Sequence, residues 1–235
     1  MAKRLNLFFD ADDTILDFDA AETAAVTRIF EEYGLINNKG IVEVYKEKNG
    51  DCWREFEQGK LERSQIGYQR FKRTFDTFNI QTDLDIDALN KKYWGYLGDQ
   101  YQVIDGSKEL LDYLCDKHNL YIITNGTTSV QNNRFKLSGY DKYFIKRYIS
   151  EQIGSKKPEK EFFSFIENDL KGIDREISYV IGDSLTSDIK AGENANIKTI
   201  WYNRKHLTNN TSIIPDYEVK DYKQLLELIN KLAEV

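Results

Sequence analysis

Short, uninterrupted hydrophobic runs are the clearest signal in the chain's pattern of apolar and polar positions. They lie at 5–9, 120–124, 144–149, 179–182 and 199–202. Unbroken runs of this length are typical of strands buried on both faces of a parallel sheet, since a half-exposed strand would alternate. Amphipathic helical patterns occur at 107–118, 127–138, 159–170, 186–195 and 222–233. Because strands and helices alternate, these segments predict an α/β fold, a Rossmann-like core with a doubly wound parallel sheet.

The stretch from 17 to 100 has a different pattern, because it contains no strand-like run. Helical patterns occupy 41–58, 63–78 and 86–99. A further helix is predicted to begin at a capping box formed by Asp19 and Glu22. A connection of this length is far longer than a strand–helix–strand unit needs. We therefore expect an all-helical cap domain, residues 17–100, inserted into a catalytic core of residues 1–16 and 101–235.

Composition narrows the class of partner. The 235 residues carry a net charge of −6, which argues against a nucleic-acid polymer because binding its backbone needs a basic surface. A small anionic substrate remains compatible, since a metal ion and one lysine can create a local positive site. No apolar stretch approaches the roughly 20 residues that span a bilayer, so we expect no membrane partner. We expect a monomer or a small homo-oligomer.

The cysteines and the start of the chain indicate a compartment. Cys52 and Cys115 lie far apart without CxxC spacing, which predicts buried or half-buried thiols in a reducing environment. The first apolar run is interrupted at Asp10, too early for a secretory signal. We expect a cytoplasmic protein. His118 and His206 have no metal-ligand spacing and are predicted to be solvated.

Carboxylates gather where the predicted strands end. The first run ends in DADDT at 10–14, and the run at 179–182 is followed by Asp183 and, five residues later, Asp188. Ligands of open α/β sheets bind at the carboxyl ends of the strands, and neighbouring strands lie about 4.8 Å apart. If these two strands are neighbours, Asp10 and Asp183 meet, and Mg²⁺ would relieve their repulsion. The alternative is that each aspartate only forms a turn.

Four ordered motifs carry a resemblance. DxDxT at 10–14, TNG at 124–126, Lys157-Pro158, and GDSxxxD at 182–188 resemble the haloacid dehalogenase (HAD) superfamily of aspartate-nucleophile phosphotransferases. The resemblance implies that Asp10 attacks phosphorus and forms an aspartyl-phosphate, and that Asp12 acts as general acid and base. Asp13 matches no mechanistic role and is interpreted as solvated or structural.

The same resemblance assigns the remaining site residues. Thr124, Asn125 and Gly126 match the phosphate-binding element, with support from the start of the following helix. Lys157 matches the lysine that neutralises the phosphate and tethers the nucleophile; the neighbouring Lys156 is the rival. The implied metal is Mg²⁺, and the residues that match its site are Asp10, Asp12 through its carbonyl, Asp183 and Asp188.

Several reactions share these residues. Dehalogenases of the superfamily work without the second aspartate, so Asp12 favours phosphate chemistry. A phosphatase or mutase for small sugar phosphates or phosphoglycolate would keep every motif. A phospho-acceptor signalling module would also gather aspartates and a lysine, but such modules are shorter and have no large insert after the first strand.

Within the superfamily, three segments look most like the pyrimidine 5′-nucleotidases that remove noncanonical nucleotides. They are DADDTILDFDAAE, WREFEQGKL and TNGTTSVQNNRF. This resemblance implies a helical cap that closes over a nucleoside monophosphate and selects it. The candidate residues for the base are Phe18, Trp53 and Phe56, and those for polar recognition are Arg54, Lys60 and Arg63. Simple helix packing and solvated basic side chains are the alternative for all six.

Overall fold

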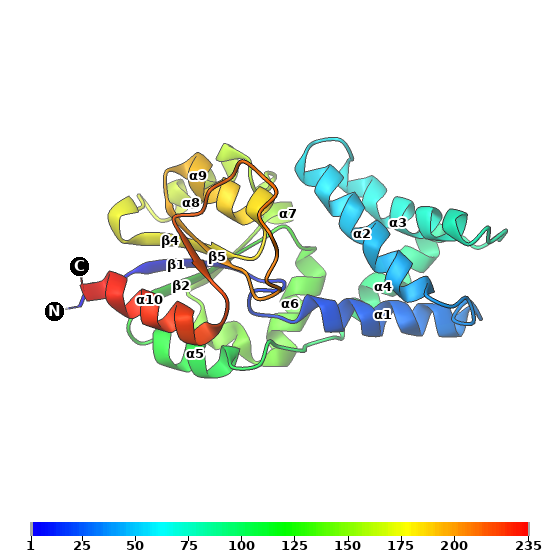
Figure 1. Ribbon diagram of the computed structural model, residues 1–235, viewed down its shortest axis with the longest axis horizontal. Coiled ribbons are helices and arrows are strands. Elements are labelled where there is room, and N and C mark those ends of the chain that lie inside the picture. Colours follow the sequence, from blue (N-terminus) through cyan, green and yellow to red (C-terminus); the bar gives the residue numbers. More distant parts are fainter. Residues whose placement is uncertain (1, 235) are drawn as a thin grey trace. The chain divides into compact units, whose positions relative to one another are not determined.

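The computed structural model describes residues 2–234, which group into two compact units (Figure 1). The first unit contains the chain up to Asp17, Val103–Thr128, and the chain from Phe135 onward. The second contains Phe18–Gln102 together with Ser129–Arg134.

A six-stranded parallel sheet forms the centre of the first unit, in the order β3-β2-β1-β4-β5-β6. Its strands are β1 (Asn6–Asp10), β2 (Asn119–Thr124), β3 (Lys146–Ile149), β4 (Ser178–Gly182), β5 (Lys198–Tyr202) and β6 (Tyr217–Val219). The predicted α/β fold with a parallel sheet is confirmed. The edge strand β6 was not predicted, because three residues are too few to form a recognisable hydrophobic run.

Helices cover both faces of this sheet (Figure 1). They are α5 (Ser107–Leu114), α6 (Thr128–Ser138), α7 (Ser150–Ile153), α8 (Lys160–Asp169), α9 (Lys190–Ala195) and α10 (Tyr222–Glu234). Leu7 and Phe9 of β1 pack with α5 and α10, whereas Phe8 packs on the opposite face with α8 and α9. Alternation along β1 therefore supplies both cores, which explains why the run in the sequence is unbroken.

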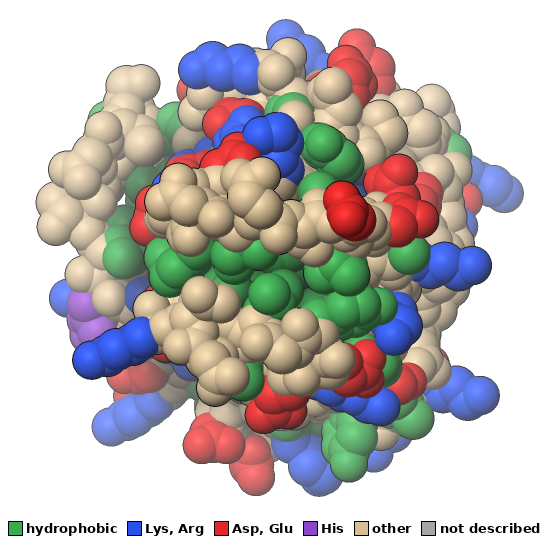
Figure 2. Space-filling model, turned by 90° about the vertical axis from the view of Figure 1, so that its right-hand side faces the viewer, with side chains coloured by type: hydrophobic (Ala, Val, Ile, Leu, Met, Phe, Trp, Pro, Cys, Tyr) green, Lys and Arg blue, Asp and Glu red, His purple; other side chains and the backbone are tan. Residues whose placement is uncertain are grey.

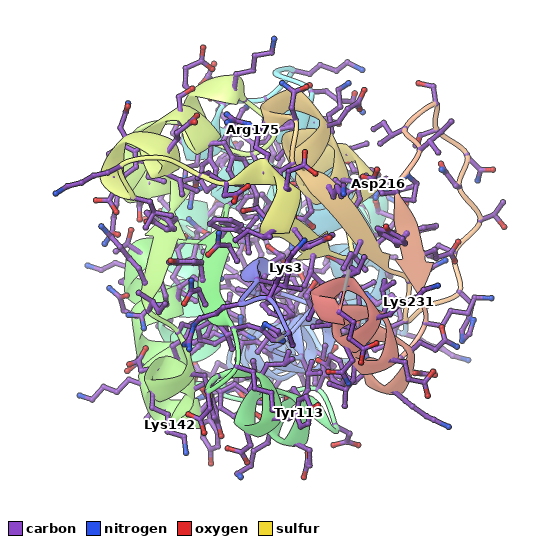
Figure 3. All side chains as sticks on the ribbon, turned by 90° about the vertical axis from the view of Figure 1, so that its left-hand side faces the viewer. Lys3, Tyr113, Lys142, Arg175, Asp216 and Lys231 are labelled. Carbon is purple, nitrogen blue, oxygen red and sulfur yellow. The ribbon has the colours of Figure 1, made fainter. Side chains whose placement is uncertain are left out.

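Two ends of the first unit's chain meet at the amino edge of the sheet. The backbone N–H of Lys3 donates to the carbonyl of Ala233 at 2.7 Å, so α10 ends beside the start of β1. Figure 3 shows this edge, with Lys3 and Lys231 labelled. The functional edge predicted from the sequence is the opposite one, where the strands end.

Four helices make up most of the second unit: α1 (Phe18–Glu32), α2 (Ile41–Glu57), α3 (Arg63–Thr77) and α4 (Ile86–Gly98). Within residues 18–102 the structure contains no strand. Their core contains a cluster of aromatic rings, in which Phe30, Tyr45 and Phe71 contact one another and Tyr93 contacts Tyr45 and Phe71. Figure 2 shows a band of hydrophobic side chains on the surface of this unit, bordered mainly by uncharged polar side chains and backbone.

A buried polar chain links all four helices of the second unit. Asn49 donates to Glu22 and accepts from Arg70 at 3.2 Å, and Arg70 also donates to Asn90 at 2.5 Å. The Arg70 guanidinium lies 4.0 Å from the centroid of the Tyr93 ring. The predicted capping box is therefore wrong. Helix α1 begins before Asp19, and the Glu22 side chain is buried against Asn49 rather than turned back to the helix start.

Three smaller expectations can be compared with the structure. The free thiols of Cys52 and Cys115 are buried and half-buried, as predicted. The prediction for His118 is wrong: its ring is buried and its Nδ1 accepts the backbone N–H of Leu5 at 3.2 Å, whereas His206 is exposed. Among residues 2–234, no helix is both long enough and apolar enough to cross a membrane.

Candidate active site

The carboxyl ends of β1, β2 and β4 lie side by side, because β1 is hydrogen-bonded to both of the other strands. Asp10 is the last residue of β1 and pairs with Ile123 of β2. Asp183 follows β4 directly. The sheet therefore brings together two aspartates that are far apart in the sequence, as the neighbouring-strand condition required.

Lys157 occupies the centre of this edge, and its ammonium group is almost completely buried. It donates to Asp10 Oδ1 at 2.5 Å, to Asp188 Oδ1 at 2.6 Å and to the carbonyl of Ile123 at 2.9 Å. The three donors of a lysine are thus all used on oxygen acceptors, two of them charged. Burial of a cation is tolerated here because it is paired on two sides.

The side chain of Asn125 fixes which lysine enters the site. Its Oδ1 accepts the backbone N–H of Lys157, and its Nδ2 donates to the Lys157 carbonyl, both at 2.9 Å. This pair of hydrogen bonds holds the Lys157 backbone in register with the end of β2. The neighbouring Lys156 instead directs its backbone N–H to Glu159 at 3.1 Å.

Asp188 reaches Lys157 from a π-helical turn, Leu185–Ile189, that replaces the first turn of the predicted helix at 186–195. π-Helical turns of this kind are frequent at functional sites. The backbone N–H of Ser184 donates to Asp188 Oδ2 at 3.1 Å. Gly182 leaves room for the carboxylate, since a Cβ at that position would lie 2.2 Å from Asp188 Oδ2.

The donor set fits a hard divalent cation. Oxygen atoms of Asp10, Asp183 and Asp188 lie within 4.8 Å of one another. Three carboxylates face a single buried lysine, so negative charge exceeds positive charge at this edge. Mg²⁺ is bound in proteins by a few carboxylates, carbonyls and waters, which is the chemistry assembled here.

The pKa values of these groups also favour a bound cation. Burial raises the pKa of the Asp10 carboxyl well above its usual range, although Lys157 lowers it; Asp188 and Asp183 raise it further. Burial also raises the pKa of Asp183, with added contributions from Asp188 and Asp13. Burial alone would lower the pKa of Lys157, but Asp10 and Asp188 raise it above its ordinary value. The lysine is therefore charged, and a further cation beside the carboxylates would favour their ionised forms.

The predicted phosphate-binding residues lie at the end of β2, at the same edge. Thr124 is buried, and its Oγ1 accepts the backbone N–H of Gly126 at 2.9 Å. Because the Asn125 side chain is turned to Lys157, this residue offers its backbone rather than its amide to a ligand. At the start of α6, the N–H of Thr128 donates to Glu151 at 2.7 Å.

The two other acids of DADDT differ from Asp10. Asp12 is half-buried and lies outside the carboxylate cluster, and a metal contact through its carbonyl stays a prediction. Asp13 has a left-handed backbone with a φ of 57°. Its side chain, 13% exposed, forms ion pairs with Arg204 and Lys205, which favours the structural interpretation over the solvated one.

The candidate substrate residues of the cap all lie in the second unit. Phe56 is buried and packs with Cys52, Leu61 and Ile66, and half-buried Trp53 lies against the same cluster. Arg54 and Lys60, the candidates for polar recognition of the substrate, are exposed, and Arg54 forms an ion pair with Asp51. Phe18 begins α1, with the Arg134 guanidinium 5.9 Å from its ring centroid. For Phe56 the burial favours helix packing over contact with a base.

Comparison with known sequences decides the family. A sequence model described as "Haloacid dehalogenase-like hydrolase" matches residues 7–202, which include all four motifs. The chain belongs to this family. The resemblance inferred from the motifs and the expected hydrolase class are thereby confirmed.

Individual relatives of this HAD-like hydrolase match along nearly its whole length. Pyrimidine 5′-nucleotidase PynA of Streptococcus pneumoniae is 39% identical over 226 residues, covering 96% of this chain and 94% of PynA. Pyrimidine 5′-nucleotidase YjjG of Escherichia coli is 28% identical, covering 96% and 97%.

A solved structure supports the fold. The putative HAD-hydrolase YfnB of Bacillus subtilis is 36% identical, and its crystal structure matches with a TM-score of 0.90, covering 97% of this chain and 99% of YfnB. That structure is described as bound to magnesium and as revealing interdomain movement.

Sequence reasoning missed three contributors to the site of this HAD-like hydrolase. The side chain of Asn125 orients Lys157, Gly182 makes space for Asp188, and Ser184 donates to it. All three lie inside the motifs already recognised. Their roles depend on contacts across the sheet edge, which no local pattern encodes.

Proposed function

We propose that this HAD-like hydrolase is a Mg²⁺-dependent phosphomonoesterase that acts through an aspartyl-phosphate on Asp10. The observation that carries the proposal is the buried Lys157 held between Asp10 and Asp188 at the end of β1. An aspartate fixed by a lysine cannot rotate away from an incoming phosphorus, and the ammonium stabilises the charge that develops there.

In the proposed reaction, an Asp10 oxygen attacks phosphorus while the bond from phosphorus to the ester oxygen breaks. Asp12 gives its proton to the departing oxygen. A water molecule then attacks the aspartyl-phosphate, Asp12 accepts a proton from that water, and inorganic phosphate leaves as Asp10 is regenerated. Lys157 neutralises phosphate charge throughout. Asp10, Asp183 and the Asp12 carbonyl would hold Mg²⁺, which would supply the remaining positive charge. Asp188 would orient Lys157 or a water bound to the metal.

We infer that the substrates are pyrimidine nucleoside monophosphates. PynA and YjjG, both named pyrimidine 5′-nucleotidases, support this choice because they match the helical unit as well as the sheet unit. The helical unit would act as the cap that selects the substrate. Among its predicted contacts, Phe18 and Trp53 remain candidates for the base, and Arg54 and Lys60 for polar groups.

The role of Asp10 is tested by Asp10→Asn. An amide oxygen is a poor nucleophile, so phosphate release from p-nitrophenyl phosphate should fall by roughly a thousandfold or more. The matched control is Asp116→Asn, which removes an exposed carboxylate of the same unit and should retain full activity. Comparable activity in Asp10→Asn and wild type would overturn the assignment.

The substrate class is tested by a screen of phosphomonoesters at saturating Mg²⁺. Pyrimidine nucleoside monophosphates should give the highest kcat/KM. Faster hydrolysis of sugar phosphates or phosphoglycolate would contradict the nucleotidase proposal while leaving the phosphatase chemistry intact. An isomerised sugar phosphate would indicate a mutase, and a phosphorylated protein without steady phosphate release would indicate a signalling module.

A further inference from the structure

The loop that follows β5 is closed on itself by one buried side chain. Asn203 accepts the backbone N–H of Leu207 at 2.8 Å and donates to its carbonyl at 2.9 Å. The same amide donates to Glu218 of β6 at 2.8 Å. These bonds hold residues 203–207 in a compact turn, so the basic residues inside it, Arg204 and Lys205, are presented from a fixed backbone.

Both basic residues meet the one acid of DADDT that has no part in the proposed reaction. Lys205 Nζ lies 2.6 Å from Asp13 Oδ2, and an Arg204 nitrogen lies 3.4 Å from Asp13 Oδ1. Asp13 itself is set by its left-handed backbone, a conformation that aspartate and asparagine tolerate better than most residues. The turn that follows Asp10 and the loop that follows β5 are thus connected by the ion pairs of Asp13.

This ion pair lies beside the carboxylate cluster. Asp13, Asp183 and Lys205 line one crevice of about 10 Å³, which is too small for a substrate group. Asp13 and Lys205 carry opposite charges, so they act in opposite directions on a cation near Asp183. Their influence on the site is therefore electrostatic rather than by contact with a ligand.

We propose that the Asp13–Lys205 pair tunes the affinity of the carboxylate site for its divalent cation: Asp13 strengthens binding and Lys205 weakens it. The proposal rests on the metal site of the proposed function. A negative charge near Asp183 attracts Mg²⁺, and an ammonium near Asp183 repels it. Because Asp13 and Lys205 form an ion pair, their opposite effects on a bound cation largely cancel, and only the net effect acts on the metal site.

The test measures Mg²⁺ binding itself by isothermal titration calorimetry without substrate. Asp13→Asn should raise the Kd by roughly three- to tenfold, and Lys205→Met should lower it by a similar factor, as expected for one charge near a divalent ion. The double variant should return to within about twofold of wild type. Lys231→Met, which removes an exposed lysine at the amino edge of the sheet (Figure 3), should leave the Kd unchanged.

The opposite changes in Kd expected for Asp13→Asn and Lys205→Met distinguish an electrostatic effect on the metal from a purely structural role of the ion pair. If the pair only clamped the loop, both single variants would weaken binding and the double variant would be no better, which would overturn the proposal. Equal Kd values in all variants would also overturn it while leaving the metal site intact. A wild-type protein that binds no Mg²⁺ would overturn the metal site and this proposal together. Asp13→Gly, which suits the left-handed backbone, replaces Asp13→Asn if that variant unfolds.

Discussion

At the scale of the residue, the site depends on how closely Asp188 can approach the end of β4. Its carboxylate lies over Gly182, accepts from the Ser184 backbone and binds Lys157. A side chain as small as a methyl group at position 182 would collide with a buried, hydrogen-bonded carboxylate rather than with the end of a flexible side chain. The spacing of the motif GDSxxxD thus has a steric basis in its first residue.

Gly182→Ala should displace Asp188 and release Lys157 from one of its two carboxylates. We expect kcat to fall by about tenfold or more and the free energy of unfolding to fall by roughly 1–3 kcal/mol, as for overpacking in a core. Steady-state kinetics and urea unfolding would measure the two effects. Gly95→Ala is the matched control: it lies in α4 with no atom near the new Cβ, and it should stabilise the protein slightly. Wild-type kinetics in Gly182→Ala would show that the close approach is dispensable.

At the scale of the element, the four helices of the second unit are joined by a chain of hydrogen-bonded polar side chains as well as by aromatic packing. Glu22, Asn49, Arg70 and Asn90 come from α1, α2, α3 and α4 in that order. Burial raises the pKa of Glu22 to about 7, although Arg70 and the hydrogen bond from Asn49 lower it. In the unfolded chain the same carboxyl titrates near its ordinary value of 4.5. Between these values the folded protein holds a proton that the unfolded chain has released.

The sign of the pH dependence follows from this difference. The stabilising contribution of protonated Glu22 is present below pH 4.5 and is lost as the pH rises through about 7. From pH 5 to pH 8 wild type should lose on the order of 3 kcal/mol that Glu22→Gln does not lose, because the amide is neutral throughout. Urea unfolding followed by circular dichroism at both pH values measures the difference.

Glu31→Gln, on the exposed side of α1, is the control for this pH series and should follow wild type. A Glu22→Gln variant with the same pH dependence as wild type would mean that the carboxyl titrates normally in the fold.

At the scale of the whole molecule, the metal should stabilise the fold that assembles its site. Asp10, Asp183 and Asp188 meet only when β1 and β4 are paired, so the unfolded chain has no equivalent site. Mg²⁺ at about 100 times its Kd should then raise the free energy of unfolding by roughly 2.7 kcal/mol, and a chelator should reverse the effect. Asp183→Asn should lose most of this shift, and Asp116→Asn should keep it. Thermal unfolding with and without MgCl₂ measures all three.

Local pattern determined much of this protein. Unbroken apolar runs predicted five of the six strands, because a buried parallel strand needs both of its faces hydrophobic. The motifs predicted the family and the strand ends that carry the chemistry. Two predictions from local pattern failed. Strand β6 was missed because it is too short to detect in the sequence. Glu22 has the spacing of a capping box with Asp19, but its side chain accepts a hydrogen bond from Asn49 of another helix.

Only the tertiary structure decided how the charged residues are paired. Asp10 meets Lys157 and Asp188 because the sheet order places β1 between β2 and β4, and strand order is a long-range property that no local segment contains. The same holds for Asp13, which the sequence left without a role and the fold joins to a loop at Lys205. The sequence by itself identified the charged side chains of the site, because their chemistry is a property of each residue. The tertiary structure determined which of them form ion pairs, because the Coulomb energy of a pair depends on the distance between its charges in space.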